Sequence, residues 1–177
     1  AYGGVVKLSP RGGFSYLGNQ PSRESGLLDN NVRCIATGQD GTIWLGTRGG
    51  GLHEWKQGSP PQVREDFKMG KVQAIAITED NRPIIGGLEG IFSQDANGRI
   101  VRLAGGALFI AALHREKGGG MWLGSQRDGV AYLPDAESPL PPIGFSDLQE
   151  KMANSRIRSF AEDAENLWIG SYAGVHR

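Results

Sequence analysis

Polar, charged and aromatic side chains recur at one kind of short turn along this chain. The four turns read Thr47-Arg48, Gly87-Leu88-Glu89, Ser125-Gln126-Arg127-Asp128 and Ser171-Tyr172. Arginine, carboxylate, amide and phenol groups together suit bidentate hydrogen bonding and stacking on a sugar or a sugar acid. The ordinary alternative is that turns are exposed and therefore polar. The candidate ligand-binding residues are Arg48, Glu89, Gln126, Arg127, Asp128 and Tyr172.

Residues for catalysis or for metal binding are scarce. His53, His114 and His176 occupy positions that appear unrelated, which argues against a metal cluster. No Ser-His-Asp or Gly-x-Ser-x-Gly arrangement is visible. The single cysteine, Cys34, sits in an apolar-polar alternation, and we expect a small buried hydrophobe. We therefore expect no enzyme activity, no metal and no cofactor.

Two further patterns imitate ion sites. Asp40, Asp80 and Asp163 recur at equivalent turns, where each could bind Ca²⁺, but turn formation explains an aspartate there without an ion. The glycine-rich runs 11–13 and 117–120 resemble phosphate loops in composition only. Since no helix is expected to follow either run, the phosphate interpretation fails.

Composition limits the class of protein. The 177 residues carry 19 basic and 19 acidic side chains, so the net charge is zero and nothing favours a nucleic-acid partner. Glycine is abundant at 28 residues, which predicts many tight turns and many short strands. No segment is apolar enough to span a membrane, and no signal peptide is visible. Because the chain starts at Ala1 rather than Met, we expect that an N-terminal part has been removed.

Four segments of the chain align as internal repeats. They cover residues 31–47, 71–87, 108–125 and 155–171. The equivalent positions Trp44, Ile84, Trp122 and Trp168 are 40, 38 and 46 residues apart. A period near 40 with short strands is typical of a four-stranded blade in a β-propeller, so we predict an all-β fold.

One repeat illustrates the four strands, which we call a to d. We expect strand a at 32–37, strand b at 42–47, strand c at 51–56 and strand d at 62–67. Asp40-Gly41 makes the a–b hairpin turn because both residues tolerate positive φ. Ligands of propellers bind where loops converge at one mouth of the channel, and the b–c turns and d–a connections should share that face.

The same pattern places the ends of the chain inside blades. We expect one partial propeller domain over 1–177, about four blades' worth, as a fragment of a larger propeller. Two longer connections, 18–30 and 135–154, interrupt the period, and the second includes a possible short helix with Ser146 as its N-cap. These two connections are either ordinary variation in loop length between blades or loops that face a ligand. The predicted boundaries are 1–17 for strands c and d of a preceding blade, 32–67, 72–103 and 108–147 for whole blades, and 156–177 for the start of another.

The motifs resemble a known family. Residues 40–47 (Asp-Gly-Thr-Ile-Trp-Leu-Gly-Thr), followed by Gly50-Gly51-Leu52, look like the two-component regulator propeller repeat. Residues 121–125 and 166–171 repeat the motif, whereas the second copy has Ile84 in place of tryptophan. We expect Trp44, Ile84, Trp122 and Trp168 to fill the blade core, and the glycine two residues later to let adjacent backbones approach.

The resemblance implies a function as well as a fold. In this family the propeller is usually seven-bladed and forms the periplasmic sensor region of a protein in the bacterial inner membrane. The better-known ligands are oligosaccharides, and a kinase or cyclase output module would lie outside this chain. We therefore expect a ligand-sensing region in a homodimeric parent. The alternatives are a propeller that binds a protein partner and, less favoured, a propeller lyase or lactonase.

Overall fold

The computed structural model describes residues 3–18, 26–67, 70–105, 108–134 and 155–177. Every regular element in these ranges is a β-strand, and all the strand pairs with an assigned register are antiparallel. The chain divides into two compact units, Ala1–Val72 and Gln73–Arg177. In the described ranges no helix is long and apolar enough to cross a membrane.

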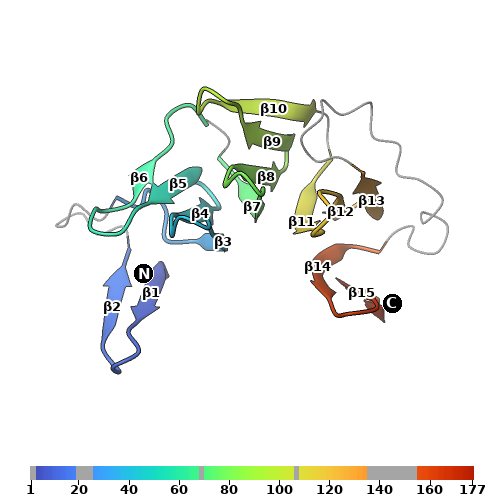
Figure 1. Cartoon of the computed structure of the whole chain (residues 1–177), viewed down its shortest axis with the longest axis horizontal. Coiled ribbons are helices and arrows are strands. Elements are labelled where there is room, and N and C mark those ends of the chain that lie inside the picture. Colours follow the sequence, from blue (N-terminus) through green and yellow to red (C-terminus); the bar gives the residue numbers. More distant parts are fainter. Residues whose placement is uncertain (1–2, 19–25, 68–69, 106–107, 135–154) are drawn as a thin grey trace. The chain divides into compact units, whose positions relative to one another are not determined.

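The first unit contains a hairpin and one four-stranded sheet (Figure 1). The hairpin pairs β1 (Val5–Leu8) with β2 (Phe14–Leu17). The sheet has the order β3-β4-β5-β6, so neighbours in sequence are neighbours in space. Its strands are β3 (Val32–Thr37), β4 (Ile43–Thr47), β5 (Leu52–Trp55) and β6 (Gln62–Val63).

The second unit contains three sheets of the same up-and-down order. They confirm the predicted all-β fold built from propeller blades. The first is β7 (Val72–Ile77), β8 (Pro83–Gly87), β9 (Gly90–Gln94) and β10 (Ile100–Gly105), with β7 starting at the end of the first unit. The others are β11 (Ile110–Arg115), β12 (Met121–Ser125) and β13 (Val130–Leu133), then β14 (Ile157–Glu162), β15 (Leu167–Ser171) and β16 (Gly174–His176).

Strand d of the first blade is shorter than the sequence predicts. The expected strand 62–67 ends at Val63, and a turn follows in which Phe67 N–H donates to the Arg64 carbonyl at 3.0 Å. The Arg64 guanidinium also pairs with Asp66, two residues on, at 2.9 Å. This local pairing favours the turn over an extended strand. The helix predicted at Ser146, and strand d of the blade predicted at 108–147, lie outside the described residues.

Neighbouring blades interlock through a glycine of strand b. A β-branched residue at the start of the next strand a fills the space that a side chain at this glycine would take. A Cβ added at the glycine would lie 2.4–2.6 Å from that side chain. The close approach is therefore between side chain and backbone, not between two backbones as the sequence suggested. The pairs are Gly46 with Val72, Gly86 with Ile110 and Gly124 with Ile157.

The four repeat positions of strand b differ in burial. Trp44 is 3% exposed and Ile84 is 1% exposed, while Trp122 is partly buried, with its ring centroid 4.6 Å from that of Tyr132. Trp168 is 37% exposed, and its indole N–H donates to Asp163 at 2.6 Å. The prediction that this ring fills a blade core is therefore wrong for Trp168 in this chain.

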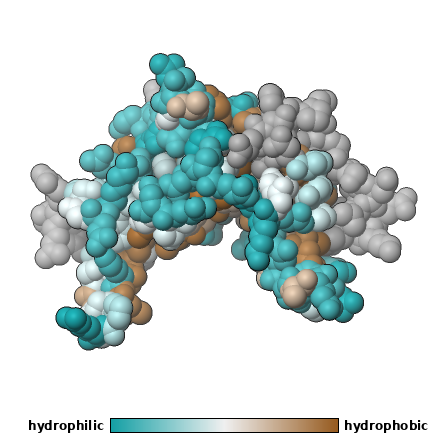
Figure 2. Space-filling model, viewed as in Figure 1, coloured by the Kyte–Doolittle hydropathy of each residue, from teal (hydrophilic) through white to brown (hydrophobic). Residues whose placement is uncertain are grey.

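The β1–β2 hairpin carries apolar side chains on its surface. Val6, Leu8 and Phe14 are exposed, and hydrophobic surface is visible beside this hairpin at the lower left of Figure 2. Val5 on the same strand is buried in a cluster with Leu27 and Leu45. One side of β1 thus packs on the following blade, as alternation along a strand requires.

Candidate functional site

The b–c turns are tied to the beginning of strand a in their own blade. The first turn residue donates its backbone N–H to the carbonyl that precedes, or nearly precedes, strand a. Since the d–a connection leads into strand a, b–c turns and d–a connections lie at one end of each blade, which we call the b–c face. The bonds are Arg48 N to Asn31 O (2.9 Å), Gln126 N to Phe109 O (3.0 Å) and Tyr172 N to Arg156 O (3.2 Å).

A hydroxyl and a glycine shape the b–c turn in three sheets, those of β3–β6, β11–β13 and β14–β16. In the first blade, Thr47 Oγ1 donates to the Gly51 carbonyl at 3.0 Å and accepts from Gly50 N–H at 2.9 Å. Gly51 has φ of +74°, a conformation that disfavours any residue with a Cβ. Ser125 and Ser171 accept backbone N–H groups in the same way in later blades. The turns are therefore ordered before any ligand arrives.

Strand a carries a β-bulge close to the b–c face in three blades. The register with strand b shifts between Val32 and Cys34, between Ile110 and Ala112, and between Ile157 and Ser159. The extra residue in each case has no cross-strand partner, and bulges commonly re-aim a side chain beside a functional site. These residues are Arg33, Ala111 and Arg158. Sequence reasoning missed both arginines, because a bulge appears only when strands are paired.

Three predicted ligand residues belong to one turn, that of the β11–β13 sheet. Gln126 is partly buried, whereas Arg127 is exposed with its guanidinium 5.5 Å from the Phe109 ring centroid. Asp128 accepts a hydrogen bond from the Ser125 hydroxyl at 2.8 Å, so this carboxylate helps to hold the turn.

The other three predicted residues lie on separate turns. Arg48 and Glu89 are exposed, and Glu89 lies 3.9 Å from the Arg102 guanidinium. Tyr172 is 68% exposed and lies beside Arg156 and Arg158. In the described ranges, the hydrogen bonds, the ion pair and the cation–π contacts of these six residues all lie within a single blade.

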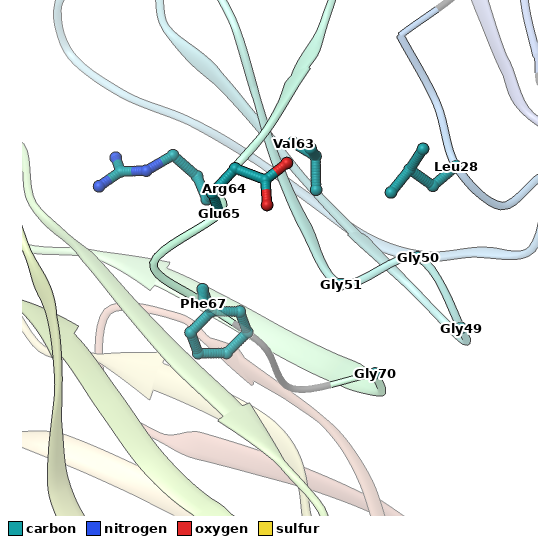
Figure 3. Close-up of a pocket in the computed structure, with 9 residues that line it drawn as sticks. All are labelled: Leu28, Gly49, Gly50, Gly51, Val63, Arg64, Glu65, Phe67 and Gly70. Carbon is teal, nitrogen blue, oxygen red and sulfur yellow. The ribbon is translucent and has the colours of Figure 1, made fainter.

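A cavity of about 230 Å³ opens on the b–c face of the first blade (Figure 3). The glycine turn 49–51 forms one wall, and Leu28, Val63 and Phe67 supply apolar surface. In Figure 3 the guanidinium of Arg64 points away from the glycine turn. Arg64 instead pairs with Asp66 at 2.9 Å and Glu54 at 3.3 Å. The cavity therefore offers backbone groups, apolar surface and the carboxylate of Glu65 (Figure 3).

The d–a connection is fastened to this turn. Asp29 accepts from Gly49 N–H at 2.6 Å and from Asn31 N–H at 2.9 Å. One residue earlier, Leu28 N–H donates to Nε2 of His53 at 3.1 Å. His53 is fully buried, and burial lowers its pKa, while a backbone contact with Gly51 and the charge of Asp29 act in the opposite direction. The accepting nitrogen is consistent with a neutral ring.

Two of the histidines occupy equivalent positions, which corrects the sequence interpretation. His53 of β5 pairs with Leu45, and His176 of β16 pairs with Ile169, at the same place in the repeat. The signal was present in the sequence, because Gly51-Leu52-His53 matches Gly174-Val175-His176. His114 lies on strand a instead, 3.0 Å from Glu162.

The aspartate carboxylates of the a–b turns accept hydrogen bonds from residues of the same turn. Asp40 accepts from Thr42 N–H at 2.9 Å and from its hydroxyl at 2.8 Å. The pKa of Asp163 is lowered because its carboxylate accepts from Glu165 N–H and then from the Trp168 indole and Asn166 N–H. In the part of the chain that the structure describes, no group of three or more His, Cys, Asp or Glu side chains could hold a metal ion.

The match to a family model falls on the first blade. Residues 26–49 match the two-component regulator propeller. These 24 residues are thus similar to that propeller repeat. The matched segment runs from the d–a connection through strands a and b to the b–c turn, so it includes the bulge at Arg33 and the aspartate at position 29. No curated protein matches the chain in sequence.

Solved structures with the propeller fold cover almost all of the chain. The extracellular domain of a hybrid two-component system from B. thetaiotaomicron matches with a TM-score of 0.75 and 19% identity, over 98% of this chain and 24% of that one. This chain thus spans about a quarter of that domain. The computationally designed Ika4 protein matches with a TM-score of 0.64 and 17% identity, over 90% and 92% of the two chains. Virginiamycin B lyase from Staphylococcus aureus matches with a TM-score of 0.68 and 10% identity, over 96% and 56%.

Proposed function

We propose that this chain belongs to the ligand-sensing extracytoplasmic region of a bacterial transmembrane signalling protein. The match of residues 26–49 to the two-component regulator propeller and the likeness to the extracellular domain of a hybrid two-component system support this proposal. The parent protein would lie in the inner membrane, with this region in the periplasm, and would signal as a homodimer. The output module would lie outside the chain.

The ligand in this proposal is an oligosaccharide or a similar small polar molecule, bound at the b–c face. The observation that carries it is the ordering of this face, where the b–c turns of the β3–β6, β11–β13 and β14–β16 sheets are hydrogen-bonded to the start of strand a. An ordered surface loses little conformational entropy on binding. Arg48, Glu89, Gln126, Arg127, Asp128 and Tyr172 would supply the side-chain contacts.

The likeness to the lyase does not favour an enzyme, since at 10% identity it concerns the fold alone. A propeller that binds a protein partner is the main competitor. It would use apolar surface such as that of the β1–β2 hairpin instead of the polar b–c face.

A thermal-shift measurement tests the proposal. The chain is heated with a panel of neutral and acidic oligosaccharides, and a ligand at about a hundred times its Kd should add about 2.7 kcal/mol of stability. We expect a selective increase in Tm that Arg48→Ala, Arg127→Ala or Tyr172→Ala weakens. If no saccharide of the panel changed Tm, the result would favour a propeller that binds a protein partner. A chelator that lowers Tm would indicate a bound metal and would favour the alternative that the propeller is an enzyme.

A further inference from the structure

Two arginine side chains flank Tyr172 at the b–c face of the β14–β16 sheet. The Cζ atom of Arg156 lies 5.7 Å from the centroid of the Tyr172 ring, and that of Arg158 lies 5.4 Å from it. Both separations fall within the range of cation–π attraction. The ring therefore gathers two positive charges on one small area of surface.

These charges are not neutralised locally. Within the described ranges neither guanidinium has a carboxylate partner, and the Tyr172 hydroxyl has no hydrogen-bond partner. Other arginines of this unit do pair, as Arg115 does with Glu79 at 3.3 Å. Glu162 closes the far end of β14, roughly 15 Å from the arginines at about 3.3 Å per strand residue. The sheet is thus positive at its b–c end and acidic at its other end.

The backbone beneath this cluster is fixed. Arg158 is the extra residue of the strand-a bulge, and Ile157, next to it, is fully buried against Gly124. On the other side, Tyr172 N–H donates to the Arg156 carbonyl at 3.2 Å, and the Ser171 hydroxyl bonds Ala173 N–H and the Gly174 carbonyl. The three side chains therefore start from ordered positions.

The equivalent positions of the first blade are exposed as well. In the first blade, Asn31, Arg33 and Arg48 correspond to Arg156, Arg158 and Tyr172, and all three are exposed. Yet Val72, from the next strand a, packs on Gly46 of the same blade. These three positions are thus exposed, whereas Gly46 of the same blade is covered by Val72.

We infer that Arg156, Arg158 and Tyr172 form a subsite for the oxyanion of an acidic saccharide, either a carboxylate or a sulfate ester. Guanidinium groups recognise both oxyanions with paired N–H donors, and the phenol O–H adds a third donor. The ring acts mainly as a support that holds the two guanidinium groups together. This inference rests on the proposed function and adds the charge class of the ligand.

Isothermal titration of the 177-residue chain tests the inference. The probes are trigalacturonate, a sulfated galactose disaccharide and neutral trigalactose. An acidic probe should bind more tightly than the neutral one, and Arg156→Gln or Arg158→Gln should weaken its binding about 10–100-fold, as for a lost charge-assisted hydrogen bond. Added salt should weaken it too.

Three variants serve as controls. Arg99→Gln removes an exposed arginine from the c–d turn, at the opposite end of the β7–β10 blade, and should leave the affinity unchanged. Tyr172→Phe keeps the ring and loses only the hydroxyl, so it should weaken binding less than Tyr172→Leu, which removes the support of both arginines.

The outcomes separate this inference from the proposed function. Equal binding of trigalactose, insensitive to Arg158→Gln, would overturn the oxyanion subsite and leave a saccharide sensor in place. No binding of any saccharide would contradict both, and arginine-dependent binding of a poly-aspartate peptide alone would point to a protein partner. If inorganic sulfate bound as tightly as the sulfated probe, and this binding also depended on the arginines, the site would recognise an anion without any contribution from the saccharide.

Discussion

The β3–β6 blade and the β14–β16 sheet carry the same residue types at equivalent positions but bury them differently. Trp44 is 3% exposed and Trp168 is 37% exposed. His53 is fully buried, whereas His176 is half-buried. Gly46 contacts Val72 of the next strand a, while a Cβ at Gly170 would meet only Ser159 of its own sheet. The same motif therefore has two different environments.

The difference shows that this repeat alone does not make a core. Both of these sheets carry a tryptophan, a strand-b glycine and a histidine at equivalent positions, and the surrounding strands decide whether these residues are buried. In repeat proteins stability is approximately a sum of terms within repeats and terms between neighbours. Equivalent substitutions in the two regions should therefore have unequal effects.

The tryptophans should give the largest contrast. Trp44→Ala should lower the free energy of unfolding by about 3–5 kcal/mol, the usual cost of deleting a buried tryptophan. Trp168→Ala should lower it by about 1 kcal/mol, mainly through the hydrogen bond to Asp163. Urea unfolding of both variants measures the difference. Equal losses would contradict the contrast.

The second largest contrast should be in thiol reactivity between the β3–β6 blade and the β14–β16 sheet. Burial raises the pKa of Cys34 to about 12, so at pH 8 its thiolate fraction is only ~10⁻⁴, against roughly a quarter for an ordinary thiol. Ser159 occupies the equivalent position and is exposed. Native Cys34 should react with Ellman's reagent roughly a thousandfold more slowly than a thiol introduced by Ser159→Cys in a Cys34→Ala background. Cys34 is partly buried, and full reactivity of its native thiol would contradict this contrast.

A Cβ added at the strand-b glycine should change the free energy of unfolding by a smaller amount. Gly46→Ala places a Cβ 2.4 Å from both Cys34 Sγ and Val72 Cγ1, and overpacking of this kind costs about 1–3 kcal/mol. Gly170→Ala meets only the Ser159 hydroxyl, which can rotate away, so its cost should stay below about 1 kcal/mol. Chemical unfolding measures both, and a larger loss for Gly170→Ala would reverse the comparison.

The smallest contrast should appear as a pH dependence. Because burial lowers the pKa of His53, the unfolded chain binds a proton more readily, and stability should fall as the pH drops below about 6.5. His53→Gln should flatten this part of the curve. His176→Gln changes the half-buried ring at the equivalent position and is the matched variant for comparison. Tm values between pH 8 and 5 provide the measurement.

The repeat and its turns were readable from the sequence, because strand b is marked by the Trp-x-Gly spacing and each turn by aspartate or glycine. The length of strand d was not, since Arg64 can pair with Asp66 in a turn or continue the strand, and only tertiary context decides. The expectation for Trp168 failed for the same reason: a motif specifies a residue's place in its blade, not what packs over it.

The b–c face was also only partly predictable. Turn residues such as Arg127 and Tyr172 stand out by type and position, and their binding role stays a prediction. Arg33 and Arg158 do not stand out, because two adjacent strands must be aligned before an unpaired residue appears. The link from Leu28 to His53 joins residues 25 positions apart, which no local pattern reveals.

The bulge in strand a gives three of the blades a position at which the residue type can vary. Its residue has no cross-strand partner, so arginine at 33, alanine at 111 and arginine at 158 are accommodated on the same backbone. Mutations there can change the recognition surface at little cost in foldability. Duplication of a blade therefore adds one more such surface residue to the propeller. A single codon change at the bulge then alters the chemistry of that residue without altering the backbone.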